Sequence, residues 1–191
     1  MLYTKKGDNG TTKNFNAKSG QRISKSSCQT EALGALDELN SFLGLVKVKA
    51  TRIPWRLGKK GALKSMKLDE RIHWVQECLF SIQAEVAGAD KRVGEEKVTE
   101  MEVLIDSIEK QLPPITTFFI SGGTELASLL DVSRTLTRKA ERRVVAGSEE
   151  EEFTVDAHTL AFLNRLSSLF YALARLTNHL SGINESAPSY R

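Results

Sequence analysis

Apolar residues recur at steps of three and four along most of this chain, which is the spacing of amphipathic helices. The spacing predicts long helices at residues 29–49, 68–87, 124–145 and 155–180. A shorter helix is expected to open at the capping box Thr99-x-x-Glu102 and to stop before Pro113. No alternating pattern is long enough for a sheet, so we predict an all-α fold, an antiparallel bundle of about four or five helices.

The helix that follows Thr124 has an apolar and a polar side. The expected core side consists of Leu126, Leu129, Val132, Leu136, Ala140 and Val144. The other side carries Arg134, Arg138 and Glu141, with Arg142 adjacent. Ion pairs on a solvated face would explain such a column. From the pattern alone this is the favoured interpretation, and the alternative is a phosphate clamp, because guanidinium groups match phosphate oxygens bidentately.

The last helix repeats this arrangement. Its expected apolar side consists of Leu160, Leu163, Leu166, Phe170, Leu173 and Leu180, and its polar side of Asn164, Tyr171, Arg175 and Asn178. In the first helix, Asp37 and Asn40 lie together away from the leucine stripe. Polar stripes on three helices indicate either solvent or a place where subunits meet around a charged site.

Composition limits the classes of function. The 191 residues carry a net charge of +3, which is too small to predict a nucleic-acid partner. The two cysteines form no disulfide framework, no apolar run approaches a membrane span, and the N-terminus has no secretion or transit pattern. We therefore expect a cytoplasmic protein with a single domain over residues 1–191, no membrane and no nucleic acid.

Three segments outside the long helices carry candidate chemistry. Residues 1–28 lack periodicity and offer hydroxyls, lysines and glycine-freed amides that could wrap a polyphosphate, or form only a polar terminus. Glu70-x-x-His73 resembles half of a di-iron motif, but its partner motif is missing, so surface residues are the better interpretation. The basic connection 51–67, with Trp55, could touch RNA or a membrane surface, but a solvated loop is favoured.

Four blocks taken together resemble the trimeric, propanediol-utilisation type of ATP:cob(I)alamin adenosyltransferases. They are YTKKGDNGTT near the start, EALGALDELNSFLG in the first helix, FFISGGTELASLLDVSRTLTRKAERRVV, and LNRLSSLFYALAR in the last helix. The similarity covers nearly the whole chain in the family's order. It implies a ferritin-like helical bundle of the cobalamin adenosyltransferase type, with 1–28 as an ATP-wrapping segment and 181–191 as a tail.

The resemblance also implies roles for particular residues. The expected contacts to ATP are Thr4, Lys5, Lys6, Gly7, Thr12, Lys13 and Lys25, with Arg138, Glu141, Arg142 and Asn164 supplied by a neighbouring subunit. Asp37 and Arg134 correspond to a salt bridge between subunits, and Phe118 to a phenylalanine on the corrin side that keeps the lower axial ligand from cobalt. No protein metal site is implied.

The chain departs from the family pattern at several positions. Ser121 replaces a proline, Lys139 an arginine and Ser168 an aspartate. The connection 51–67 is long, and the tail offers Tyr190 where the family has a phenylalanine. These departures concern the corrin side more than the ATP side.

The resemblance predicts a transferase that moves the adenosyl group of ATP to cob(I)alamin and releases triphosphate. Mg²⁺ is expected with ATP, and a corrinoid reductase is expected to supply the electron. A homotrimer with sites at its interfaces is the expected assembly. The alternatives are a non-catalytic bundle that binds nucleotide or corrinoid, and an interaction protein whose polar stripes are only subunit contacts.

Overall fold

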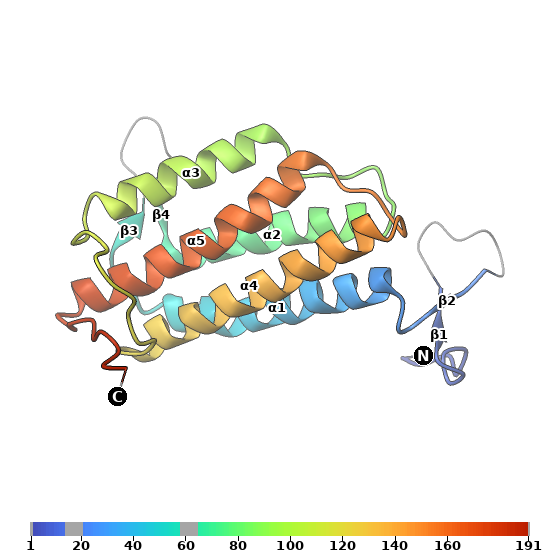
Figure 1. Cartoon of the computed structure of the whole chain (residues 1–191), viewed down its shortest axis with the longest axis horizontal. Helices are drawn as coiled ribbons and strands as arrows, with labels where there is room; N and C mark the ends of the chain where they lie inside the picture. The colour runs from blue at the N-terminus through green and yellow to red at the C-terminus, as the bar shows by residue number, and fades with distance from the viewer. Residues whose placement is uncertain (1, 14–20, 58–64, 191) are drawn as a thin grey trace.

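The residues described by the computed structural model, 2–13, 21–57 and 65–190, form an elongated bundle of five helices (Figure 1). The helices are α1 (Cys28–Ala50), α2 (Leu68–Val86), α3 (Glu95–Glu109), α4 (Glu125–Glu149) and α5 (Ala157–Leu180). The predicted all-α bundle is confirmed. The long helices begin and end close to the predicted residues, except that α4 continues to Glu149.

Helices α1 and α4 lie side by side and run in opposite directions. The ion pairs between them link the start of one helix to the end of the other: Glu31–Arg143 at 3.6 Å, Glu38–Lys139 at 2.5 Å and Lys49–Glu125 at 2.7 Å. Helix α5 packs on α4, and α3 packs on α5.

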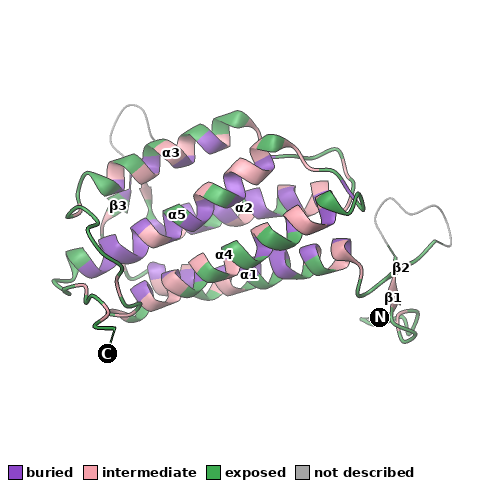
Figure 2. Cartoon of the chain, in the orientation of Figure 1, coloured by how far each residue is buried: buried purple, intermediate pink, exposed green. Residues whose placement is uncertain are grey.

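The core lies between the inward faces of the helices, where Figure 2 shows the buried residues. Among the fully buried side chains are Leu36, Leu39, Leu43, Ile72, Leu79, Ile82, Leu166 and Phe170. Burial of this apolar surface is the main force that holds the helices together. Because the seams between helices are closed by such side chains, loops and helix edges are left to form the cavities.

The predicted core side of α4 is wrong in part. Val132 is 43% exposed, whereas Leu130, Ser133 and Thr137 are buried. Ser133 and Thr137 can enter the core because their hydroxyls donate to backbone carbonyls four residues earlier, at 2.9 and 2.8 Å. The buried face of α4 is thus rotated about the helix axis relative to the face predicted from its apolar residues.

The last turns of α5 also differ from the prediction. Leu180, assigned to the apolar side, is 51% exposed, while Arg175 and Asn178, assigned to the polar stripe, are 4% and 7% exposed. The segment after α5 and the loop before α4 lie over these two polar residues and hydrogen-bond to them. Within the polar stripe of α5, Asn164 is therefore exposed and Tyr171 partly exposed, whereas Arg175 and Asn178 are buried.

Helix α3 begins a turn earlier than its capping box predicts. Its N-cap is Gly94, and Thr99 lies within the helix. The buried face of α3 starts at Val98, so packing against the core extends the helix past Thr99. At the starts of α1, α4 and α5, the side chains of Ser27, Thr124 and Asp156 each accept a backbone hydrogen bond.

Two short antiparallel ribbons accompany the bundle. β1 (Thr11–Thr12) pairs with β2 (Ile23–Ser24), and β3 (Arg56–Leu57) pairs with β4 (Met66–Lys67). Trp55 is partly buried and packs against the core. Residues 58–64 of the basic connection lie outside the described part. Within the described residues, no helix is both long and apolar enough to cross a membrane.

Candidate functional site

A cavity of about 570 Å³ lies between the loop joining α3 to α4 and the facing sides of α4 and α5. Phe118 lines it from the loop, Arg134 and Arg138 from α4, and Ser168 and Tyr171 from α5. The Phe118 ring is 79% exposed. The structure thus brings three of the predicted site residues, Phe118, Arg134 and Arg138, to one cavity that combines an apolar ring with guanidinium groups.

Arg138 and Arg134 differ in their partners. Arg138 is exposed, and none of the residues that the structure describes pairs with it. Arg134 is held at 3.4 Å from Asp131 on the same helix, and its guanidinium lies 6.0 Å from the centre of the Tyr171 ring. Arg138 is therefore the cation of this cavity that is available to an anionic ligand.

A second pair of predicted residues meets along the same seam between α4 and α5. The Asn164 amide donates to Glu141 at 3.0 Å, and the Asn164 oxygen accepts from Arg165 at 2.8 Å. Arg165 in turn donates to Glu102 of α3 at 3.0 Å. The amide of Asn164 is thereby oriented from both sides. Arg165 was not among the predicted site residues, because arginine at that position reads as an ordinary surface cation.

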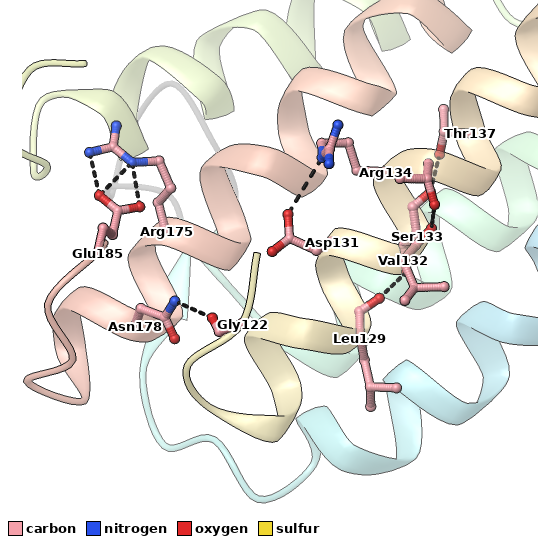
Figure 3. A network of polar contacts seen from close by, with 11 residues as sticks. Gly122, Leu129, Asp131, Val132, Ser133, Arg134, Thr137, Arg175, Asn178 and Glu185 are labelled. Atoms are coloured by element: carbon pink, nitrogen blue, oxygen red, sulfur yellow. Dashed lines mark hydrogen bonds and ion pairs between the residues drawn. The ribbon is translucent and has the colours of Figure 1, made fainter. Parts of the chain in front are cut away.

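A smaller cavity of about 320 Å³ lies next to the first one, between the 119–123 loop, α4, α5 and the segment after α5. Arg134 and Tyr171 separate the two cavities, since both line each of them. Figure 3 shows Arg175 of this wall joined to Glu185, and Asn178 joined to Gly122. Burial raises the pKa of the Tyr171 hydroxyl, so this group stays neutral and can donate a hydrogen bond.

The N-terminal segment folds back on itself. The Lys25 ammonium donates to the Gly7 carbonyl at 2.9 Å, and the backbone N–H of Lys25 donates to Gly10 at 2.9 Å. A side chain at position 7 would crowd the Lys25 ammonium, which lies 3.2 Å from the place of a Cβ atom. Thr12 lies in the ribbon, while the side chains of Thr4, Lys5, Lys6 and Lys13 are exposed around it. Lys25 is thus bound to the segment 4–13, and these residues together are called the N-terminal turn below.

The N-terminal turn and the seam between α4 and α5 do not meet within the chain. Figure 1 shows the β1–β2 ribbon beyond the end of the bundle, whereas Arg138 lies in the middle of α4. The first turn of α1 faces Arg143, more than a helical turn beyond Arg138. One chain therefore supplies two separate halves of the predicted ATP site.

The predicted Asp37–Arg134 contact is also absent within the described chain. Asp37 is exposed on α1, and Arg134 is paired with Asp131. The neighbouring Glu38 pairs with Lys139 of α4. Lys139 therefore faces α1, and the replacement of arginine by lysine there does not alter the cavity.

The Glu70-x-x-His73 pair has a structural role. Glu70 accepts a hydrogen bond from the Lys67 backbone at the start of α2, and the His73 ring lies 3.8 Å from Glu77. In the part of the chain that the structure describes, no three His, Cys, Asp or Glu side chains are grouped as metal ligands.

The chain matches a known protein family and several of its members. The profile of a family described as cobalamin adenosyltransferase matches residues 2–177. The corrinoid adenosyltransferase of Bacillus subtilis is 37% identical over 184 residues, which are 96% of this chain and 90% of that protein. The corrinoid adenosyltransferase PduO of Citrobacter freundii is 37% identical over 178 residues. That match takes 93% of this chain, which spans 50% of the Citrobacter protein.

Solved structures match over the whole length. One is a phenylalanine-to-histidine variant of the PduO-type ATP:corrinoid adenosyltransferase from Lactobacillus reuteri, complexed with cobalamin and ATP. It has a TM-score of 0.83 and 30% identity, covering 99% of this chain and 97% of that one. An arginine-to-lysine variant of the same enzyme, complexed with ATP, has a TM-score of 0.81 and 30% identity, covering 98% of this chain and 99% of that one.

Proposed function

Because the chain belongs to the cobalamin adenosyltransferase family, we propose that it transfers the 5′-deoxyadenosyl group of ATP to the cobalt of cob(I)alamin. The products are adenosylcobalamin and inorganic triphosphate. Relatives from Bacillus and Citrobacter bear the name of this activity, and the similar Lactobacillus enzyme binds both cobalamin and ATP. The whole chain acts as one domain in this proposal.

One observation carries the proposal for this chain. The cavity between α4, α5 and the α3–α4 loop has an exposed phenylalanine ring, Phe118, and an unpaired guanidinium, Arg138, on its walls. A reaction between a large apolar macrocycle and a triphosphate ester needs both surfaces at one place. An apolar wall receives the corrin, and a cation receives the phosphates.

The chemistry requires no nucleophile from the protein. Cobalt(I) donates an electron pair to the 5′-carbon of ATP, so that a Co–C bond forms. The bond from that carbon to the phosphate oxygen breaks, and its electron pair leaves with triphosphate. No proton has to be moved in this step, since the corrinoid supplies the reactivity. The tasks left to the chain are to orient the two substrates and to stabilise the charge of the leaving group.

Arg138 and Arg142 hold the triphosphate, together with Lys25 from the N-terminal turn. These cations offset the negative charge that grows on the departing oxygen. Glu141 and Asn164 bind the nucleoside part of ATP through hydrogen bonds, for which Arg165 fixes the Asn164 amide. Mg²⁺ reaches the site on the phosphates of ATP, since this ion is usually bound through substrate phosphates and retained waters.

Phe118 acts on the other substrate. Its ring excludes water and the lower ligand base from one face of the corrin, which leaves cobalt four-coordinate. Four-coordinate cobalt(II) is easier to reduce, so a corrinoid reductase can supply the electron that generates cobalt(I). Exposure of the ring supports this role, because 79% of Phe118 is uncovered by the chain's own residues.

A complete site needs two copies of the chain. The N-terminal turn with Lys25 lies beyond the end of the bundle, and Arg138 lies at mid-helix, so one copy supplies each half. We propose a homotrimer in which each N-terminal turn covers the seam of its neighbour. Asp37, exposed on α1, then pairs with Arg134 of an adjacent subunit.

The reaction is tested by mixing the purified chain with ATP, Mg²⁺ and anaerobically reduced cob(I)alamin. The visible spectrum is expected to change from that of cob(I)alamin to that of adenosylcobalamin, with one triphosphate released per corrinoid. Omission of ATP is the control. Binding of both substrates without triphosphate release would instead show a non-catalytic corrinoid-binding protein.

A further inference from the structure

The loop that carries Phe118 has no regular structure of its own. Residues 113–123 connect α3 to α4 without a helix or strand, so their conformation depends on what they contact. The contacts come from the last turns of α5 and from the segment that follows it.

Arg175 of α5 is the centre of these contacts. Its side chain is 4% exposed, and its Nε and Nη2 atoms donate to the Glu185 carboxylate at 2.8–3.0 Å (Figure 3). Nη2 also donates to the Pro113 carbonyl at 3.1 Å. The guanidinium lies 5.2 Å from the centre of the Phe119 ring, which is next to Phe118. One buried side chain thus touches the loop at both of its halves and the segment after α5.

Two further contacts fasten the same loop. The Ile120 backbone N–H donates to the Ser186 carbonyl at 2.8 Å. Asn178, one turn after Arg175, donates to the Gly122 carbonyl at 2.8 Å and accepts from the Thr124 backbone at 3.0 Å. Gly123 has a φ of +105°, and a Cβ atom there would lie 2.4 Å from the Asn178 side chain, so the close approach requires glycine.

We propose that residues Ile183–Ser186 form a strap that fixes the Phe118 loop. The Arg175–Glu185 ion pair holds this strap against α5. Arg175 and Glu185 are positioning residues: they touch neither substrate, and they act by holding the ring of Phe118 at the corrin. The role at the corrin rests on the proposed function, whereas the strap itself rests only on the contacts within the chain.

The chemistry of the Arg175–Glu185 pair explains why it can hold the strap in place. A guanidinium that forms two parallel hydrogen bonds to a carboxylate gives a strong and directional contact. The hydrogen bond with Glu185 raises the pKa of Arg175, so the arginine stays charged. If Glu185 is removed, a charged group remains buried against Phe119 without its counter-ion. The segment after α5 then loses its strongest attachment, and the loop loses the support behind Ile120.

The strap is tested first without any substrate. Hydrogen exchange measured by mass spectrometry on residues 113–123 should rise about tenfold or more in Glu185→Ala, and less in Glu185→Gln, which keeps one acceptor. Glu149→Gln, at the opposite end of the bundle, is the matched control and should exchange like the wild type. Unchanged exchange in Glu185→Ala would overturn the proposal.

The second readout is kinetic. Glu185→Ala should raise the KM for the corrinoid or lower kcat by about tenfold to a hundredfold, with the KM for ATP unchanged. Arg175→Lys should behave similarly, since an ammonium cannot reach Glu185 and Pro113 in the same fork geometry. An equal rise in both KM values would contradict a role confined to the corrin side. Faster loop exchange with wild-type kinetics would do the same.

The two proposals can fail separately. If the wild type forms no adenosylcobalamin, the proposed function is wrong, and the exchange experiment still decides whether the strap exists. If the wild type is active and the loop of Glu185→Ala exchanges at the wild-type rate, the strap is wrong while the function stands.

Discussion

Arg138 is the side chain on which the proposed reaction depends most. It lies in the wall of the large cavity, and no described residue neutralises it. Arg138→Ala should lower the turnover rate by about a hundredfold or more, because the leaving triphosphate loses its bidentate partner. Arg138→Lys should retain part of the activity, since it keeps the charge without the fork.

The matched control for Arg138 is the next residue. Lys139 is also cationic, but it faces α1 and pairs with Glu38. Lys139→Ala should leave turnover within about twofold of the wild type and lower the stability by about 1 kcal/mol at most, as for other exposed ion pairs. Equal losses in both variants, measured by triphosphate release, would show that charge alone matters and that the orientation of the helix does not.

Phe118 should produce a different kinetic defect. Phe118→Ala removes the apolar ring from the corrin side and leaves the cations in place, so ATP binding should stay within about twofold of the wild type. Turnover with cobalamin should fall by about tenfold to a hundredfold, because the lower ligand and water regain access to cobalt. Calorimetry with ATP and steady-state kinetics with the corrinoid separate the two effects. Loss of ATP binding with normal corrinoid kinetics would reverse the assigned role.

The two cysteines should differ in reactivity. Burial raises the pKa of the Cys78 thiol to about 12, while Cys28 is partly exposed at the start of α1. The thiolate is the reactive form, so Cys78 should resist iodoacetamide at about pH 8 in the folded protein. Mass spectrometry should find no adduct on Cys78 until a denaturant is added. Rapid modification of Cys78 without denaturant would contradict its place in the α2 core.

At the scale of elements, the first turn of α5 predicts a dependence of stability on pH. The His158 backbone N–H donates to the Asp156 carboxylate, which lowers the pKa of Asp156 below its usual value in the folded protein. The carboxylate therefore stabilises the fold above that usual pKa, and its contribution is lost as the pH falls through the lowered value. Asp156→Asn keeps a cap but cannot titrate. The melting temperature of the wild type should approach or fall below that of the variant between about pH 5 and about pH 3. If the melting temperatures of the wild type and of Asp156→Asn changed in parallel with pH, the charge of the cap would have no effect on stability.

The sequence was sufficient to predict the long helices, because each has an apolar stripe at helical spacing and most have a polar cap. The prediction failed where polar side chains enter the core because their own helix backbone accepts their hydrogen bonds. Ser133 and Thr137 do this within α4 by donating to their own helix backbone. It also failed at α3, where packing at Val98 outweighs the capping box at Thr99.

The candidate site was predictable only in part, and for a physical reason. Arg138 and Glu141 lie three residues apart on α4, so their shared face can be inferred from spacing. Arg175, in contrast, was assigned to an open polar stripe, although it is buried by its contact with Glu185. Glu185 follows α5 in an aperiodic segment, and no spacing rule relates it to the Phe118 loop. Contacts between loops and tails have to be seen in three dimensions.

The two halves of the proposed nucleotide site lie far apart on one chain. The N-terminal turn holds Lys25 at Gly7, whereas Arg138 lines the cavity between α4 and α5, and Arg142 is exposed one turn further along α4. Closed symmetry allows each copy to give one half and to receive the other. Exchange of halves requires an oligomer, and the proposed homotrimer should appear as a trimer in sedimentation analysis. A monomer with full activity would contradict it.

Hybrid trimers test the exchange of halves directly. Lys25→Ala and Arg138→Ala should each be inactive alone, because each removes a cation from every site. When the two variants are co-expressed in equal amounts, about a quarter of the sites should pair an intact N-terminal turn with an intact neighbouring seam. Activity should return to about that fraction of the wild type. Co-expression of Arg138→Ala with Arg142→Ala is the matched control, and it should restore nothing, because both changes lie on the same half. Recovery in neither mixture would place Lys25 and Arg138 in a site built by a single chain.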